Sequence, residues 1–356
     1  MKFIEEVKAS QGVRVAERLI SLHPYVKLPS YAADKEEDSK SPKYVHWPHN
    51  SKSRDDKADN GKRHNGNGSI DGLLDSVQSQ GNRIEPLFLE YPKLVPAITV
   101  KYPSRTISLL EVPNRAADPA VRYLFETELT ALAAGDPLPL AKKNPTAFIF
   151  GLYDSRATMI NIPRAVAADV TVRNAAFRPV AASLTTPFSV DERADLTETF
   201  TQIDLKLSQA GIDQVPVYNE RGAVDVDGAT IERVVVLSTG MLERYRKDVV
   251  LYDYLFSLAI IATLAPTNSV LRSGTTLVRE KREVEVFRDL QSAVLGEPDF
   301  GEVVQYAEKA AKHFADTYGF ASKEELVVST DSILSDAKRF SEGKAAKKQK
   351  KGSSKK

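Results

Sequence analysis

The chain has 356 residues, of which 42% are hydrophobic and 27% charged, as in a soluble globular protein with one large or two ordinary domains. It has no cysteine, which excludes disulfides, thiol catalysis and cysteine metal sites and fits a reducing compartment. The net charge of +1 conceals seven lysines within residues 344–356, and the rest of the chain carries 42 basic against 48 acidic residues. A wholly basic surface is excluded, so nucleic acid would have to meet a local patch.

The two segments that bear on membrane insertion both argue against it. Residues 1–10 carry Glu5 and Glu6 and no apolar core, so they do not form a signal peptide. The longest apolar run, residues 254–265, is too short to span a bilayer and follows Asp253. We therefore expect a core helix there and a cytoplasmic protein without membrane contact.

The first third of the chain alternates between ordered and polar stretches. Residues 1–28 form a short ordered start, in which the valines and Leu19 favour a strand or a helix edge. Residues 34–68 are rich in Asp, Lys, Asn, Gly and Ser, which predicts a loop or a disordered insertion. A helix is predicted over residues 70–85, with Ser69 as its N-cap and Pro86 as its stop.

The remaining elements mix strands and helices without a regular alternation, which favours an α+β fold. The tail at 344–356 is expected to be disordered because it is rich in lysine. Strands are predicted at residues 87–89, 97–100, 106–111, 147–152, 166–172, 233–238 and 275–287 (the last as one long strand or a pair), and helices at residues 248–264, 302–316 and 331–340.

The predicted helix over residues 70–85 carries a stripe of uncharged polar side chains. Ser76, Ser79 and Arg83 are three and four residues apart, and Asn82 lies further round the helix. Hydroxyls, an amide and a guanidinium suit phosphate and sugar oxygens, whereas the stripe offers no histidine or carboxylate pair for proton transfer. The alternative is a polar flank that faces solvent or forms hydrogen bonds within the fold.

Two other stretches place arginine beside serine at the end of an apolar element, where a rigid scaffold can orient it. The first, residues 146–166, contains Arg156 and Arg164, and the second, residues 264–278, contains Arg272 and Ser273. Either stretch taken alone is equally compatible with a loop held by a surface salt bridge.

Four motifs in a fixed order carry a family resemblance: "LLDSVQSQGNRIEPLF", "EVPNRAADPAVRY", "FIFGLYDSRATMINIPRA" and "LRSGTTLV". Over residues 70–290 the chain resembles the RAMP-superfamily backbone subunit of type I-G (formerly I-U) CRISPR effector complexes. The resemblance implies an RRM-like, ferredoxin-like palm with inserted elements. It implies several copies along one CRISPR RNA, in a complex with other subunits that presents the spacer to target DNA. The subunit would be a scaffold without catalytic activity, cofactor or metal.

Carried onto this sequence, the resemblance makes polar and basic side chains from all four motifs candidates for contacts with the RNA backbone. Arg115 and Arg164 have an alternative role, since either can pair with Asp118 or Asp169. The candidate RNA contacts are Ser76, Ser79, Asn82, Arg83, Arg115, Arg156, Arg164, Arg272 and Ser273.

The resemblance and the predicted elements together give a domain plan. Residues 1–290 form the body, with a polar insertion at 34–68 and a hairpin or thumb insertion at 180–228, where prolines and glycines suggest strands and turns. Residues 291–343 form a helical extension, followed by the tail at 344–356. The insertion at 34–68 and everything after residue 290 do not match the family pattern.

Two alternative functions remain open. A metal-dependent RNA-cleaving RAMP protein would use Asp71 or Asp75, although acids at the start of a helix also complement its dipole. A general protein-interaction scaffold would hold no RNA. No histidine or cysteine occurs from residue 65 to 312, which excludes a histidine-based ribonuclease centre there. A metal site at His46, His49 and His64 lacks a framework to fix its geometry.

Overall fold

The architecture is known from a computed structural model. The whole of the predicted insertion at 34–68 and most of the one at 180–228 lie outside its described part. No helix within that part is long and apolar enough to cross a membrane. The structure describes residues 2–27, 70–178, 190–202, 223–266, 270–272, 274–289, 291–320 and 323–353.

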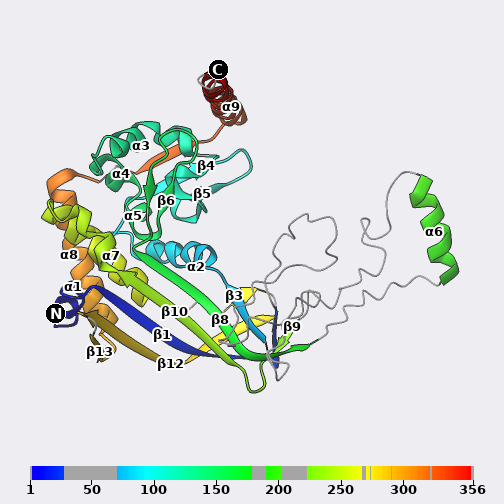
Figure 1. Ribbon diagram of the computed structural model, residues 1–356, viewed down its shortest axis with the longest axis horizontal. Helices are drawn as coiled ribbons and strands as arrows, with labels where there is room; N and C mark the ends of the chain where they lie inside the picture. Colours follow the sequence, from blue (N-terminus) through cyan, green and yellow to red (C-terminus); the bar gives the residue numbers. More distant parts are fainter. Residues whose placement is uncertain are drawn as a thin grey trace.

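A large sheet forms the centre of the fold, and its long strands run side by side across the molecule (Figure 1). The strand order is β11-β12-β1-β10-β8-β9-β2, with β13 paired to β12 and β3 paired to β8. Every pairing in this sheet is antiparallel. The strands are β1 (Gly12–Ser21), β2 (Tyr25–Lys27), β3 (Ile70–Asp75), β8 (Val166–Arg178), β9 (Ala223–Asp225), β10 (Thr230–Ser238), β11 (Val270–Arg272), β12 (Thr275–Arg288) and β13 (Gln291–Leu295).

The four longest strands have one buried face and one open face. In β1, Val13 and Val15 are buried, whereas the intervening Arg14 is partly exposed. In β10, Val235 is buried and Val236 is 39% exposed. This alternation follows from the two-residue period of a strand. Helices α2 (Val77–Ile84) and α7 (Val249–Leu264) pack on the buried face.

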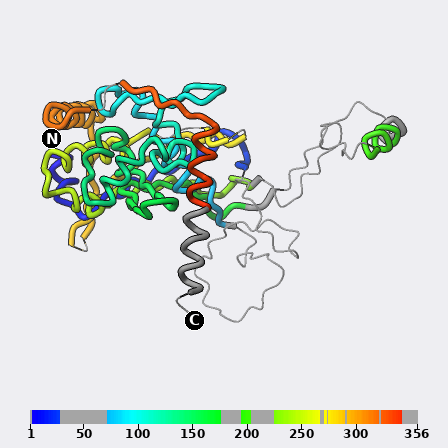
Figure 2. Tube along the Cα trace, turned by 90° about the horizontal axis from the view of Figure 1, so that it is seen from above, coloured from blue at the N-terminus to red at the C-terminus, as the bar shows by residue number. Residues whose placement is uncertain are grey.

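Helix α7 (Val249–Leu264) is the central helix of the core. Asp248 caps it by accepting a hydrogen bond from the Leu251 amide at 3.0 Å. The helix is apolar on all sides because it packs between the sheet and helix α8 (Phe300–Tyr318). Tyr254 stacks on Phe314 of α8, with ring centroids 4.4 Å apart. Figure 2 shows that α8 lies at the edge of the molecule near the N-terminus.

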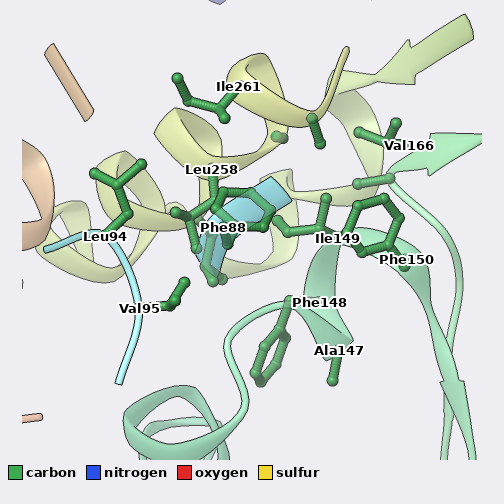
Figure 3. Packing of buried hydrophobic residues seen from close by; sticks show 14 of the residues in the cluster. Phe88, Leu94, Val95, Ala147, Phe148, Ile149, Phe150, Val166, Leu258 and Ile261 are labelled. Atoms are coloured by element: carbon green, nitrogen blue, oxygen red, sulfur yellow. The ribbon is translucent and has the colours of Figure 1, made fainter. Parts of the chain in front are cut away.

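A smaller unit packs beside α7 and is built around the three-stranded sheet β14-β4-β5. Strand β14 joins β4 in parallel, so the C-terminal part of the chain completes this sheet. Figure 3 shows Ile149 of this unit reaching toward Phe88, and toward Leu258 of α7, and all three belong to one hydrophobic cluster. The elements are β4 (Ile98–Lys101), β5 (Thr106–Ser108), β6 (Leu152–Tyr153), β7 (Asn161–Ile162), β14 (Glu324–Val327), α3 (Glu126–Ala133), α4 (Leu138–Lys143) and α5 (Ala147–Phe150).

The remaining helices are α1, α2, α6 and α9. Helix α6 and strand β9 both lie in the predicted thumb insertion at 180–228, whose other residues up to 222 are mostly outside the described ranges. Helix α9 continues to Ser353, in contrast to the disordered tail expected from residue 344. The bounds are α1 (Lys2–Lys8), α2 (Val77–Ile84), α6 (Val190–Gln202) and α9 (Thr330–Ser353).

Three other predictions were wrong. Residues 70–75 form strand β3 instead of the start of a helix, because pairing with β8 satisfies their backbone. Residues 147–150 form a helical turn instead of a strand, since a short apolar run does not distinguish a buried strand from a buried helix. Residues 87–89 belong to a 3₁₀ helix, η1 (Glu85–Glu90). Pro86 does end the α-helix, as expected.

The segment after residue 290 is part of both sheets instead of a separate helical extension. Strand β13 extends the large sheet through β12, and β14 extends the small sheet through β4. Helix α8 between them covers α7. The fold therefore depends on this segment, although its sequence lies outside the four motifs.

The alternation along β10 predicts a difference between neighbouring valines. Val235→Ala should lower the free energy of unfolding by about 2 kcal/mol, because it leaves a cavity in the core. Val236→Ala, on the open face, should change it by less than about 0.5 kcal/mol. Urea unfolding midpoints of the two variants measure the difference. Equal losses would show that the open face is covered in the free protein.

Candidate nucleic-acid interface

Helix α2 presents the polar stripe, but it begins later than the sequence predicts. Ser76, not Ser69, is its N-cap, and the Ser76 hydroxyl accepts a hydrogen bond from the Ser79 amide at 3.3 Å. Gln80 and Ile84 are buried against the sheet. The opposite arc, called the α2 arc below, faces outward and consists of Gln78, Ser79, Asn82 and Arg83.

Arg164 extends the arc on one side. Its guanidinium donates a hydrogen bond to the Gln78 side chain, which in turn donates to Asn82 Oδ1 at 3.3 Å and to the Pro113 carbonyl at 3.1 Å. Arg164 is exposed, so its remaining donors face solvent. Partial burial and the nearby charge of Arg115 lower the pKa of Arg164 from its ordinary value.

Gly151 makes room for this arginine. Its φ is +82°, a conformation that side chains rarely adopt. A Cβ there would lie 2.8 Å from Arg164 Cγ and 3.0 Å from the Ile162 carbonyl oxygen. A glycine at this position therefore lets the backbone pass close to Arg164 and hold it beside α2.

Arg83 and Arg272 lie on the other side of the arc and meet at Asp75. Arg83 Nε lies 3.0 Å from Asp75 Oδ2, and Arg272 Nη2 lies 3.7 Å from Asp75 Oδ1. Arg83 also donates to the carbonyls of Val270 and Leu271. Both side chains are about three quarters buried, and they fix strand β11 to β3. To a ligand at the arc they would offer positive charge rather than hydrogen-bond donors, because most of their donors are already used.

Arg272 also connects the arc to β2. Its Nη1 donates to the Lys27 carbonyl at 2.6 Å, and its Nη2 donates to the Leu74 carbonyl. The exposed side chain of Lys27 lies over Gly274 and adds a further positive charge there. Ser273, a predicted RNA contact, lies outside the described residues.

A row of buried polar side chains, called the buried polar row below, positions α2 on the sheet. Glu17 of β1 and Arg233 of β10 are directly opposite in register, and their side chains are 2.7 Å apart. Arg233 Nε donates to Gln80 at 3.0 Å, and Gln80 donates to Asp75 at 2.6 Å. Burial lowers the pKa of Arg233 and the Glu17 carboxylate opposes that shift. The row ties the base of α2 to the centre of the sheet.

Arg115 conflicts with its predicted contact to RNA, because only 2% of its side chain is exposed. Its Nε lies 2.8 Å from Glu85, its Nη1 donates to the Gly151 carbonyl at 3.2 Å, and it stacks over Phe150. Burial raises the pKa of Glu85, against the effect of Arg115. Arg115 is a structural support beneath α2, and its carboxylate partner is Glu85, not Asp118 or Asp169, which the sequence offered as an alternative to RNA.

Arg156 lies away from the α2 arc, against helix α9. Its Nη1 is 3.8 Å from Asp336, and its guanidinium lies over the Phe340 ring. Beside it, the buried Arg122 bridges Asp154 at 2.9 Å and Asp336 at 3.3 Å. This cluster fastens α9 to the body, so the structure separates Arg156 from the other predicted contacts.

The residues proposed for metal-dependent cleavage also have structural partners. Asp71 accepts a hydrogen bond from the Asn174 amide at 2.9 Å, and Asp75 is 4% exposed beneath Arg83. Within the described ranges, no three His, Asp or Glu side chains are grouped to bind a metal ion. His46, His49 and His64 lie outside those ranges.

Sequence reasoning missed the residues that organise the site. Gln78 joins Arg164 to α2, and Gln80 joins Asp75 to Arg233, 153 positions away. Gln78 and Gln80 lie in the quoted polar motif, but nothing in that motif separates an exposed glutamine from a buried one. Because residues 70–75 form strand β3, helix α2 begins at Val77 and not at residue 70. This later start determines that Gln80 faces the sheet and Gln78 faces outward.

One comparison with known proteins links part of the chain to a CRISPR-associated family. Residues 42–176 match the family described as CRISPR-associated protein GSU0053 (Cas_GSU0053), a match that includes β3 and α2 but less than half of the chain. No curated protein matches the sequence. A solved chain described as "CRISPR RNA-guided surveillance complex, pre-nicking" aligns at 10% identity over 91% of this chain and 98% of its own. Its TM-score of 0.30 is too low to establish a shared fold.

The Asp154 cluster predicts an acid-sensitive attachment of α9. Burial would raise the pKa of Asp154, but hydrogen bonds from Arg122 and Thr158 lower it to about 2, from 3.8. Such a carboxylate stabilises the fold by about 2 kcal/mol above pH 4, and this stabilisation is lost as the pH falls from about 4 to about 2.

The measurement compares urea unfolding of the wild type and Asp154→Asn between pH 6 and pH 2. The difference in unfolding free energy should be largest near pH 6 and shrink toward pH 2. Asp316→Asn, at a carboxylate 62% exposed on α8, is the matched control and should show almost no difference. A difference for Asp154→Asn that is independent of pH would contradict this assignment.

Proposed function

We propose that the chain is a non-catalytic backbone subunit that binds CRISPR RNA in a type I-G surveillance complex in the cytoplasm. The observation that supports this proposal most directly is the α2 arc. Its polar side chains Gln78, Ser79 and Asn82 lie between Arg164 on one side and the pair Arg83 and Arg272 on the other. The family match to a CRISPR-associated protein, which includes α2, supports the assignment of this arc.

The arc suits a sugar-phosphate chain of any sequence. Hydroxyl and amide groups hydrogen bond to phosphate and ribose oxygens, and the flanking guanidiniums supply positive charge. A subunit that holds every spacer must leave the base edges free to pair with target DNA. Copies of this chain would then make the same backbone contacts at successive positions along one RNA, beside other subunits of the complex.

The strand order supports an RRM-like palm. The central strands run β12-β1-β10-β8, all antiparallel, with α7 between β10 and β12 in the chain, as in a ferredoxin-like sheet. RRM domains stack bases on aromatic residues of the open sheet face. Here the open face of β1 and β10 carries Arg14, which pairs with Glu232 and with Glu285 of β12. This favours the α2 arc over the sheet face for RNA.

Arg164→Gln should weaken binding of single-stranded RNA by about three- to tenfold. The slope of log Kd against log salt concentration should fall by about one. The physical reason is the loss of one exposed cation at the arc. Fluorescence anisotropy at several salt concentrations measures both quantities. Arg173→Gln, which removes a half-exposed cation from the open sheet face, is the matched control and should change little.

Co-expression with a matching CRISPR array and the other effector subunits tests the wider proposal. The purified complex should retain a discrete, array-derived RNA and should leave labelled complementary RNA intact in Mg²⁺ or Mn²⁺. Regularly spaced cuts that disappear in Asp71→Ala would overturn the non-catalytic assignment. Complexes without RNA, despite array transcription, would favour a general protein-interaction scaffold.

A further inference from the structure

A β-bulge brings two arginines of β12 to the same side of the sheet. Opposite β1, Glu17 pairs with Arg282 and Leu19 pairs with Arg279, so the register shifts by one residue between Arg18 and Leu19. In a regular strand, residues three apart point to opposite faces. The extra residue lets both Arg279 and Arg282 face Glu17, and bulges commonly re-aim side chains in this way.

These two arginines join Arg233 around one buried carboxylate. Glu17 is fully buried, and two guanidiniums approach it in addition to that of Arg233: Arg282 Nε lies at 3.4 Å and Arg279 Nη1 at 3.7 Å. Three guanidiniums therefore lie around one carboxylate, with Arg233 and Arg282 buried and Arg279 partly exposed. Such an excess of buried charge is unfavourable unless a further anion lies nearby.

Glu297 supplies that anion from the segment after β13. Its Oε1 lies 3.1 Å from Arg282 Nη1 and 3.4 Å from Arg279 Nη1. Glu297 is 52% exposed and Arg279 is 40% exposed, so solvent reaches this side of the cluster. One oxygen of one exposed carboxylate thus faces both guanidiniums.

The cluster has more donors than Glu297 satisfies. Arg282 is 93% buried, and its Nη2 finds no hydrogen-bond acceptor among the residues that the structure describes. A buried donor without a partner costs about 1 to 3 kcal/mol. A phosphate group carries more acceptor oxygens than Glu297 offers here and matches the fork of donors on a guanidinium.

We propose that Arg279 and Arg282 form a second anion site, for a phosphodiester of nucleic acid, which the Glu297 carboxylate occupies in the free protein. Nucleic acid would displace Glu297 to solvent and bind the two guanidiniums in its place. The site lies on β12 and is separate from the α2 arc, to which the buried polar row connects it through Glu17 and Arg233. The choice of nucleic acid as ligand rests on the proposed function, whereas the anion chemistry does not.

The test measures the affinity of single-stranded RNA, by anisotropy at several salt concentrations, for the full chain and for Glu297→Gln. The variant should bind RNA about two- to fivefold more tightly, because no carboxylate at position 297 competes for the arginines. The slope of log Kd against log salt concentration should be steeper by about one. Glu90→Gln, at an exposed carboxylate on η1, makes the same change in net charge and should leave the affinity unchanged.

The double variant Glu297→Gln/Arg279→Gln should lose the gain. A gain that persists without Arg279, or one that Glu90→Gln reproduces, would overturn the site and indicate a general effect of charge. Unchanged affinity of Glu297→Gln with a lowered melting temperature would also overturn it and make Glu297 purely structural. Because Arg164→Gln reports on the α2 arc alone, failure of the second site is distinguishable from failure of the proposed function.

Discussion

The structure depends on charges that are paired across the centre of the sheet. In β1, Glu17 lies between Val15, which belongs to one hydrophobic cluster, and Leu19, which belongs to another. In β10, Arg233 lies in the same way between Ile231 and Val235. The buried polar row therefore divides the core in two. Removing one partner would leave a buried charge uncompensated, at a cost of about 3 to 5 kcal/mol.

This constraint determines what α2 can do. Gln80 joins the helix to Arg233 and Asp75, and the helix is thereby held with its opposite arc outward. Arg115 and Glu85 fill the space beneath, where polar groups must be paired. Arginines that look equivalent in the sequence thus serve different purposes. Several hold the fold together, whereas Arg164 lies exposed beside the arc.

Sequence periodicity predicted the parts of the fold in which burial is local. The strands around residues 98–101, 166–178 and 230–238 and helix α7 were foreseen, because their side chains alternate or remain apolar over a long run. The start of α2 was not, since residues 70–75 are apolar enough for either a helix or a strand. Their pairing with β8, about a hundred residues away, decided the outcome.

Local sequence was sufficient to predict the α+β composition, the polar character of residues 76–83 and the helix stop at Pro86, and it shows that no cysteine or histidine occurs from residue 65 to 312. The tertiary structure decided which arginines are exposed, that Arg115 and Arg156 lie away from the arc, and that a bulge joins Arg279 to Arg282. The physical reason is that burial and pairing of a long charged side chain depend on partners far away in the chain. The local sequence shows where an arginine stands, whereas the fold determines which carboxylate or carbonyl group it contacts.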